Sequence, residues 1–214
     1  MANLLNDEVK QQIEQFLTQM ENTVEMVLFT KEGSCQTCKE TKELLSEVAK
    51  LNDKLTYTHK DIDKDKDQAE AYGITMTPSF VLLDKEGQYQ GVKFNGIPAG
   101  HEINSFLSAI LDVSGKTFDI DEKIIAKLKQ LDKDVNIKVF VTLSCPHCPG
   151  AVQNAHRLAL LSDKVEGEMI EAQTFAQMSS KFNVSGVPKI VINDEHEIVG
   201  NQPLDAYFEY IDKL

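Results

Sequence analysis

The spacing of apolar residues along the first half of the chain changes repeatedly between that of a strand and that of a helix. Apolar runs bounded by glycine or turn residues predict strands near residues 25–30, 55–60, 79–83 and 88–94. Apolar positions at helical spacing predict helices over about 6–20, from Cys35 to about 51, over 65–72 and over about 99–112. The expected order is helix, strand, helix, strand, helix, two strands and a closing helix.

The second half of the chain repeats this order. Helices are expected over 120–131, 146–161, 173–181 and from 203, and strands over 137–142, 165–171, 189–193 and 196–200. In both halves a C-x-x-C pair follows the first strand, and a proline, Pro78 or Pro188, stands 43 residues after the first cysteine. The repeat of these landmarks after 110 residues indicates a tandem duplication. We therefore predict domains 1–115 and 116–214, held together by a short, turn-rich linker (112–119).

This order of elements, with C-x-x-C after the first strand and a proline opening the third, is the thioredoxin pattern. The motifs "CQTC", "CPHC", "TMTP" and "SGVP", with the segment 96–115, resemble the two-domain, glutaredoxin-like protein disulfide oxidoreductases over essentially the whole chain. A more distant likeness is to the N-terminal module of flavin-dependent alkyl hydroperoxide reductases, also a doubled thioredoxin fold, which typically keeps one working dithiol. The resemblance implies an α/β chain of two tandem thioredoxin-like domains, each a central mixed sheet flanked by helices, with an extra N-terminal helix.

Paired cysteines at this spacing suit thiol–disulfide exchange, in which a thiolate attacks a disulfide sulfur. Unpaired N–H groups at a helix N-terminus stabilise a thiolate, so Cys35 and Cys145 are expected to be the exposed nucleophiles. Cys38 and Cys148, one turn further on, are expected to resolve the mixed disulfide. The residues between the cysteines should tune each couple, and they are Gln36 and Thr37 in the first motif and Pro146 and His147 in the second.

The Pro-His dipeptide of the second motif matches that of DsbA, whose attacking cysteine is strongly acidic and whose couple is oxidising. His147 can add a hydrogen-bond donor or a positive charge beside the Cys145 thiolate, whereas the first motif has no ionisable group between its cysteines. The resulting hypothesis is that Cys145 and Cys148 form the more oxidising and more reactive couple.

The resemblance also implies that Pro78 and Pro188 follow cis peptide bonds and face the cysteines, and that Thr77 and Val187 present their backbone to a bound peptide strand. Thioredoxin has a buried acidic proton acceptor in the strand before its cysteines. The matching positions here are interpreted as Phe29 and Val139, so the sequence does not identify the acceptor. The histidines outside the second motif are expected to be solvated side chains that belong to no cluster, and they are His59, His101, His156 and His196.

Charge and composition narrow the possible partners. The formal net charge of −12 argues against nucleic acid or an anionic membrane, since both attract an excess of Lys and Arg. No apolar run approaches the ~18 residues of a membrane span, and the first residues lack signal-peptide features, so a cytoplasmic location is expected. All four cysteines fall in the two pairs, which disfavours a structural disulfide framework.

Three functional classes follow from the cysteine pairs. The favoured one is a protein dithiol–disulfide oxidoreductase that acts on protein disulfides or dithiols, receives electrons from a thioredoxin-reductase-like flavoprotein and needs no cofactor beyond its disulfides. The first alternative is a dedicated electron relay to a peroxidase or flavoprotein partner. The second is a zinc-bound interaction protein, which the spacing disfavours, because 106 residues separate the two pairs and four-cysteine zinc sites usually have about 15–20.

Overall fold

The computed structural model describes residues 4–33 and 35–214. The strands of the first half are β1 (Val24–Thr30), β2 (Leu55–Asp61), β3 (Ser79–Leu83) and β4 (Tyr89–Asn95), and those of the second are β5 (Val135–Val141), β6 (Val165–Glu171), β7 (Lys189–Ile192) and β8 (His196–Val199). The helices are α1 (Asp7–Leu17), α2 (Cys38–Ala49), α3 (Lys66–Ala71), α4 (Ile103–Val113), α5 (Glu122–Leu128), α6 (Cys148–Leu161), α7 (Ala176–Lys181) and α8 (Leu204–Ile211), with a 3₁₀ helix η1 (Gly100–Glu102) before α4. None of these described helices is long and apolar enough to cross a membrane.

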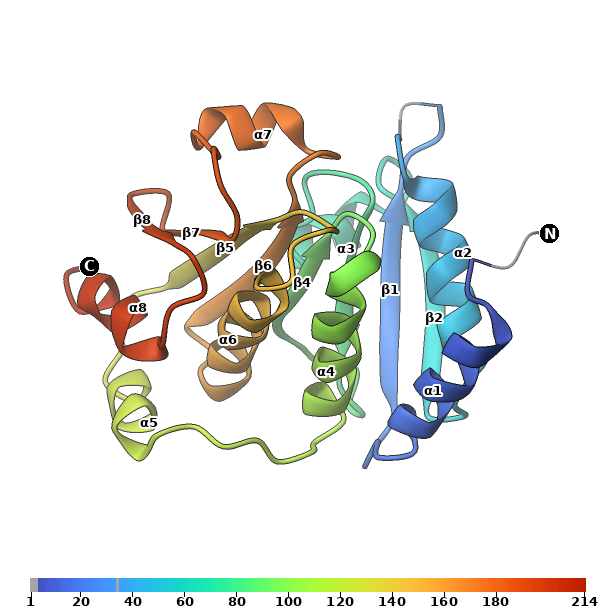
Figure 1. The fold of residues 1–214 in the computed structure, drawn as a ribbon, viewed down its shortest axis with the longest axis horizontal. Helices are drawn as coiled ribbons and strands as arrows, with labels where there is room; N and C mark the ends of the chain where they lie inside the picture. The colour runs from blue at the N-terminus through green and yellow to red at the C-terminus, as the bar shows by residue number, and fades with distance from the viewer. Residues whose placement is uncertain (1–3, 34) are drawn as a thin grey trace.

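The described strands form one eight-stranded sheet in the order β2-β1-β3-β4-β6-β5-β7-β8 (Figure 1). In each half the third strand runs antiparallel to its two neighbours, and the halves meet where β4 pairs in parallel with β6, with Phe94 opposite Met169. The prediction of two tandem thioredoxin-like units with mixed sheets, flanking helices and an extra N-terminal helix is confirmed. The structure adds that the sheets of the two halves join edge to edge and form one continuous sheet.

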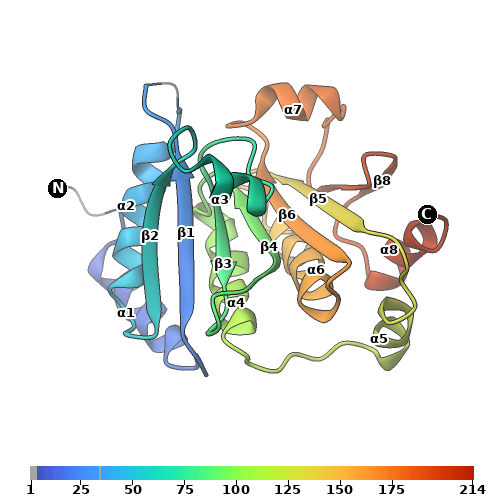
Figure 2. The same cartoon turned by 180° about the vertical axis from the view of Figure 1, so that it is seen from behind.

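Helices cover the two faces of this sheet unequally. On one face, side chains of α1, α2, α4, α5, α6 and α8 belong to a single apolar cluster that extends across both halves. On the other face α3 and α7 each cover a smaller cluster of their own, and Figure 2 shows α3 in front of the sheet. The large cluster stabilises the packing of the two halves against each other, because hydrophobic stabilisation grows with the apolar area removed from water.

A buried polar network crosses the boundary between the halves on the opposite face of β4 and β6. Lys93 is 2% exposed, and its Nζ lies 2.7 Å from Oε1 of Glu166. The Tyr89 hydroxyl donates to the same Oε1 atom (2.6 Å), and Asn95 Nδ2 donates to Glu168 Oε2 (2.9 Å). A shift of the β4–β6 register would leave these groups without partners, and a buried charge without a partner is costly. The network therefore stabilises the observed register.

Both helices that follow the cysteine motifs begin later than predicted. The first helical residues of α2 and α6 are Cys38 and Cys148, so Cys35 and Cys145 lie in the turn before each helix. The loop that leads to the first motif is also one residue longer than the loop that leads to the second. Most other element ends agree with the prediction to within one to three residues, close to the range in which helix and strand ends are ambiguous.

The longer loop changes which strand residues correspond between the halves. Leu28 pairs with His59 in the first half, and Val139 pairs with Met169 in the second. Leu28 and Val139 both belong to the large apolar cluster, whereas Phe29 points to the α3 face. The assignment of Phe29 as the counterpart of Val139 is therefore wrong, because the extra loop residue shifts β1 by one position relative to the cysteines.

Candidate active sites

The two cysteine pairs lie at the same edge of the sheet. The pair directions of the strands between them show that β1 and β5 point the same way. Each C-x-x-C motif follows the C-terminal end of its strand. Cys35–Cys38 and Cys145–Cys148 are both disulfides, with Cα atoms 5.4 and 5.5 Å apart. Each disulfide stands at the start of a helix, where the helix dipole and unpaired N–H groups favour a thiolate after reduction.

The two disulfides are well separated along this edge. Three strands lie between β1 and β5, which makes four strand spacings, or roughly 19 Å. Exchange requires contact between sulfur atoms, so the two sites cannot exchange electrons directly with each other. They also cannot share one zinc ion, whose bonds to sulfur are about 2.3 Å long. Within 4–33 and 35–214, no three His, Cys, Asp or Glu side chains gather as a metal site would require.

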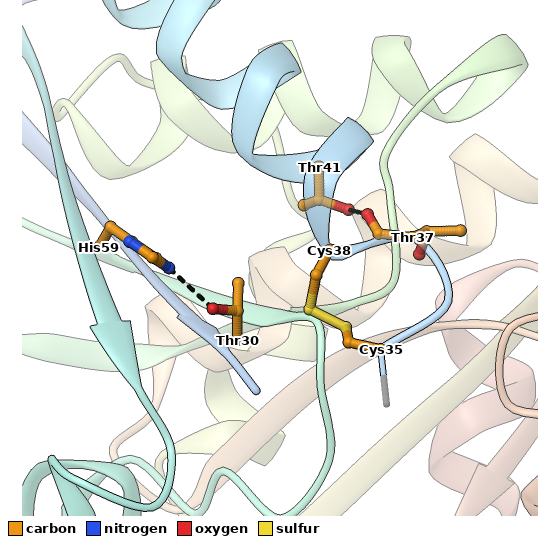
Figure 3. The surroundings of a disulfide bond; sticks show 6 residues. All are labelled: Thr30, Cys35, Thr37, Cys38, Thr41 and His59. Atoms are coloured by element: carbon orange, nitrogen blue, oxygen red, sulfur yellow. Dashed lines mark hydrogen bonds between the residues drawn. A yellow bond between two sulfur atoms is a disulfide. The ribbon is translucent and has the colours of Figure 1, made fainter. Parts of the chain in front are cut away.

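Threonines surround the first disulfide (Figure 3). The carbonyl oxygen of Thr37 accepts hydrogen bonds from the N–H (2.9 Å) and the hydroxyl (2.7 Å) of Thr41 in the first turn of α2. The hydroxyl of Thr37 is itself buried and finds no partner among the described residues. Gln36 is exposed, and Cys35 and Cys38 are both partly exposed. Both residues of the first cysteine pair are therefore more exposed than those of the second.

The second disulfide is more deeply buried. Cys145 is 8% exposed and Cys148 is 0% exposed, and both belong to the large apolar cluster. Pro146 and His147 are exposed, and the His147 side chain makes no capping bond to α6. The prediction of an exposed nucleophile is wrong for Cys145 in this oxidised state, because the apolar cluster covers it. The exposed part of this motif is therefore its Pro-His dipeptide.

A proline loop accompanies each dithiol. The Thr77–Pro78 and Val187–Pro188 peptide bonds are both cis, with the prolines buried and the preceding residues half-buried. In the second half the Val187 carbonyl oxygen lies 3.8 Å from Cys145 Sγ. The backbone before this proline therefore stands beside the disulfide. A threonine precedes the proline in one half and a valine in the other, so the two loops carry different side chains at this position.

A buried glutamate that the sequence did not single out lies level with the second dithiol. Glu102 is 0% exposed, its Oε2 accepts from the Ser105 hydroxyl, and its Oε1 has no partner among the described residues. Burial raises the pKa of this carboxyl to about 7, while the Ser105 hydrogen bond lowers it. Its helix, η1, packs against α6, and the His101 N–H donates to the carbonyl oxygen of Leu143, just before the second motif (2.9 Å).

The pairing of α4 with α6 supports this placement of Glu102. Arg157 of α6 donates through Nε to Asp112 Oδ2 of α4 (2.8 Å), and Figure 1 shows the two helices side by side. Asp112 lies ten residues after Glu102, and Arg157 lies nine residues after Cys148. The starts of the two helices are therefore level. Glu102 of the first half is therefore level with the start of α6, the helix that carries Cys148, and the residues of the strand before the cysteines could not reveal it.

One histidine differs sharply from its prediction. His156 of α6 is 1% exposed, and its Nε2 lies 3.1 Å from the Lys93 carbonyl oxygen of β4. Its ring centroid is 4.6 Å from that of Phe94, and burial lowers its pKa to about 4. The expectation of a solvated side chain is wrong for His156, because α6 packs over β4 of the other half. This ring is neutral and contributes to the contact between the halves.

The other three histidines are less buried. His101 is exposed and His196 is half-buried. His59 is also exposed, but its Nε2 lies 2.7 Å from the Thr30 hydroxyl. The expectation of a solvated side chain is confirmed for His59, which also makes this hydrogen bond to Thr30.

A family model described as the thioredoxin domain matches two segments of this chain, residues 23–108 and 135–212. The chain belongs to the thioredoxin-domain family. Each matched segment contains one C-x-x-C motif and the cis-proline loop that accompanies it. The chain is a thioredoxin-fold oxidoreductase with two disulfides.

Named relatives of this thioredoxin-domain chain include the F component of alkyl hydroperoxide reductase, AhpF. The protein from Staphylococcus aureus is 34% identical over 192 residues, which are 90% of this chain and 34% of the relative, and that from Staphylococcus epidermidis is 33% identical over the same length. The chain therefore spans about a third of these relatives.

Solved structures resemble the whole chain. The NTD_N/C domain of alkylhydroperoxide reductase AhpF from Enterococcus faecalis superposes with a TM-score of 0.89 at 29% identity, covering 97% of this chain and 99% of that one. A protein disulfide oxidoreductase from Aeropyrum pernix gives a TM-score of 0.89 at 26% identity, covering 96% and 91%. Both families named from the sequence are thus structural neighbours.

Proposed function

We propose that this chain is a protein dithiol–disulfide oxidoreductase that uses both C-x-x-C sites. The observation that carries the proposal is the presence, in each half, of a disulfide at a helix start together with a cis-proline loop, with the Val187 carbonyl oxygen beside Cys145 Sγ. An extended peptide can pair with the backbone before such a proline, which would align its sulfur with the attacking cysteine. The solved relative named a protein disulfide oxidoreductase supports this substrate class.

The exchange at the second site proceeds in two steps. The Cys145 thiolate attacks a substrate disulfide, so that a mixed disulfide forms and one substrate sulfur leaves as a thiolate. Cys148 then attacks Cys145 Sγ, which releases the second substrate sulfur and restores the disulfide. Glu102, with its pKa raised to about 7 by burial and its Oε1 unpartnered in the described chain, is suited to accept the Cys148 proton.

The first site uses Cys35 as nucleophile and Cys38 as resolving residue, with Thr77 and Pro78 as its docking loop. Its greater exposure favours larger or less complementary substrates than the second site accepts. Gln36 and Thr37 supply no charge to this dithiol, whereas His147 lies in the second motif. The two sites therefore differ in access and in the groups between their cysteines, and we expect them to differ in substrate preference.

A dedicated electron relay is the second candidate function. It is supported by the relatives named as the F component of alkyl hydroperoxide reductase and by the burial of Cys145, which a partner of complementary shape would overcome. In this case a thioredoxin-reductase-like flavoprotein would reduce the chain, and the chain would reduce a peroxidase. Either function uses only the two disulfides as redox groups, and both fit a cytoplasmic protein.

Reduction of insulin by dithiothreitol, with and without the chain, separates the two functions. A general oxidoreductase accelerates insulin reduction, and Cys35→Ser and Cys145→Ser each remove part of the rate. A dedicated relay reduces insulin weakly but still exchanges rapidly with small aromatic disulfides. If the double variant Cys35→Ser/Cys145→Ser retains the full activity of the wild type in both assays, neither function holds. Mass-spectrometric thiol trapping in redox buffers then gives the potential of each couple.

A further inference from the structure

The first dithiol has an imidazole close by, at a position where the second half has no titratable side chain. Thr30, the last residue of β1, is 9% exposed, and its Oγ1 lies 2.7 Å from Nε2 of His59 on the neighbouring strand β2. Figure 3 shows Thr30 between the His59 ring and the Cys35–Cys38 disulfide. The imidazole, the hydroxyl and the dithiol thus form a row that ends at the exposed edge of β2.

The strand registers identify the matching residues of the second half. Since His59 faces Leu28 and Met169 faces Val139, His59 corresponds to Met169, and Thr30 corresponds to Val141. Met169 and Val141 are both 0% exposed. The second half therefore has two hydrocarbon-like side chains where the first has a hydroxyl bonded to an imidazole.

The position of Thr30 lies near the dithiol in this fold. Its counterpart Val141 belongs to the same apolar cluster as Cys145 and Cys148. Because the two halves share one fold, the side chain at the end of β1 lies beside the cysteines of its own site, as Figure 3 shows. The first site therefore places a proton-conducting hydroxyl where the second has a valine.

The charges around His59 favour its neutral form. Burial lowers its pKa most, and Lys42 of α2 lowers it further. Asp61 of β2 and Asp65 in the loop before α3 act in the opposite direction, and Lys60 partly neutralises Asp65 at 3.4 Å. A neutral ring protonated at Nδ1 accepts the Thr30 O–H hydrogen bond at Nε2. The ring is then ready to take up a proton.

We propose that His59, acting through the Thr30 hydroxyl, takes up the proton that Cys38 loses when it resolves a mixed disulfide at the first site. The Cys38 proton passes to Thr30 Oγ1 while the hydroxyl's own proton passes to His59 Nε2. The Cys38 thiolate attacks Cys35 Sγ, the Cys35–Cys38 bond forms, and the bond from Cys35 to the substrate sulfur breaks. The substrate sulfur leaves with the electron pair and is protonated by water, and the imidazolium returns its proton to solvent.

His59 acts on Cys38 only through Thr30, which lies between the ring and the disulfide. The role rests on the dithiol exchange proposed above. It also explains how two sites with no buried acid at the expected position of the preceding strand can both deprotonate a resolving cysteine. The second site uses a carboxyl from the other half, and the first uses an imidazole from its own neighbouring strand.

The test uses the full chain with the second site disabled as Cys145→Ser/Cys148→Ser. The reduced protein is mixed in a stopped-flow instrument with one equivalent of dithiobis(nitrobenzoate), a coloured aromatic disulfide. Attack by Cys35 releases the first nitrothiobenzoate at a rate proportional to the reagent concentration. Resolution by Cys38 releases the second at a rate independent of it. The two phases therefore report separately on the two cysteines.

Two substitutions, His59→Gln and Thr30→Val, should each slow the second release at pH 7 by about tenfold and leave the first release unchanged. This is less than the 10²–10⁴ typical of a general base, because a thiol also ionises partly by itself. In the parent the second release should be constant above about pH 7 and fall as His59 protonates. In the two variants it should instead rise toward about pH 8.5, where a free thiol ionises.

Two matched controls exclude a merely structural effect. Thr30→Ser keeps the hydroxyl and should retain both rates, and His196→Gln, far along the sheet on β8, should change neither. An unaltered second release and pH profile in both His59→Gln and Thr30→Val would overturn the proposal. An equal slowing of both releases would also overturn it, since the pair would then act on Cys35. Absence of any first release from the parent would instead overturn the proposed exchange itself.

Discussion

Glu102 gives the most quantitative prediction, because a carboxyl that is fully buried and shielded from solvent must affect stability as well as chemistry. Glu102→Gln keeps the size and shape of the side chain and can still accept the Ser105 hydrogen bond, but it removes the charge. In the folded protein the carboxyl has its pKa raised to about 7 from an ordinary 4.5 by burial. The substitution therefore removes a group whose ionised form is disfavoured by the fold.

The sign and size of the effect follow from proton linkage. Between pH 4.5 and 7 the folded state binds the Glu102 proton and the unfolded state does not, so stability falls as pH rises through this window. Each pKa unit corresponds to about 1.4 kcal/mol of folding stability. The shift is roughly 2.5 units, and most of the resulting loss of stability occurs between pH 5 and pH 8. Glu102→Gln should thus gain about 2.5 kcal/mol of stability relative to the wild type on going from pH 5 to pH 8.

Urea unfolding of the oxidised proteins at pH 5 and pH 8 measures this difference. Glu209→Gln, on the exposed surface of α8, is the matched control and should give the same stability difference from the wild type at both pH values. A Glu102→Gln difference that does not change with pH would refute the reasoning, because it would mean that Glu102 ionises equally well in the folded and unfolded chains. A difference that decreased with pH would contradict the predicted sign.

Three further predictions concern the boundary between the halves and the second dithiol. Lys93→Met removes the buried cation that pairs with the partly exposed Glu166 and the buried Glu168, and it should destabilise the chain by about 3 kcal/mol in urea unfolding. Lys164→Met, at an exposed ion pair, should cost less than about 1 kcal/mol. Gly100→Ala places a Cβ against the Leu143 carbonyl oxygen, just before the second motif, whereas the Cβ of Gly87→Ala meets no atom within 4 Å. Both glycines have a similar positive φ, so both substitutions strain the backbone. Gly100→Ala should therefore lower the melting temperature by several degrees more than Gly87→Ala does. Iodoacetamide titration should find Cys145 the more acidic of the two attacking thiols, and equal values for both would reject the influence assigned to the Pro-His dipeptide.

The elements with strong local patterns could be predicted from the sequence. Strand β1, helix α2 and strand β3 have apolar runs or a clear helical stripe, and the cysteine-to-proline spacing repeats at the same length in both halves. Strand β4 is different, since Lys93 and Asn95 alternate with apolar residues as they would on a solvated face. Its pairing with β6 buries them, and only a partner strand 73 residues away carries the glutamates that make this possible.

By itself the sequence determined that the chain contains two dithiols in two copies of one fold, because a cysteine spacing, a proline and an apolar period are local features that no distant residue can change. The residues that surround each dithiol depend on how the two halves pack, which local sequence patterns do not specify. Glu102 and His156 have ordinary helical settings in the sequence, and both are buried because the other half packs over them. Burial and pKa depend on which distant groups surround a side chain, and the edge-to-edge joining of the two sheets sets those neighbours.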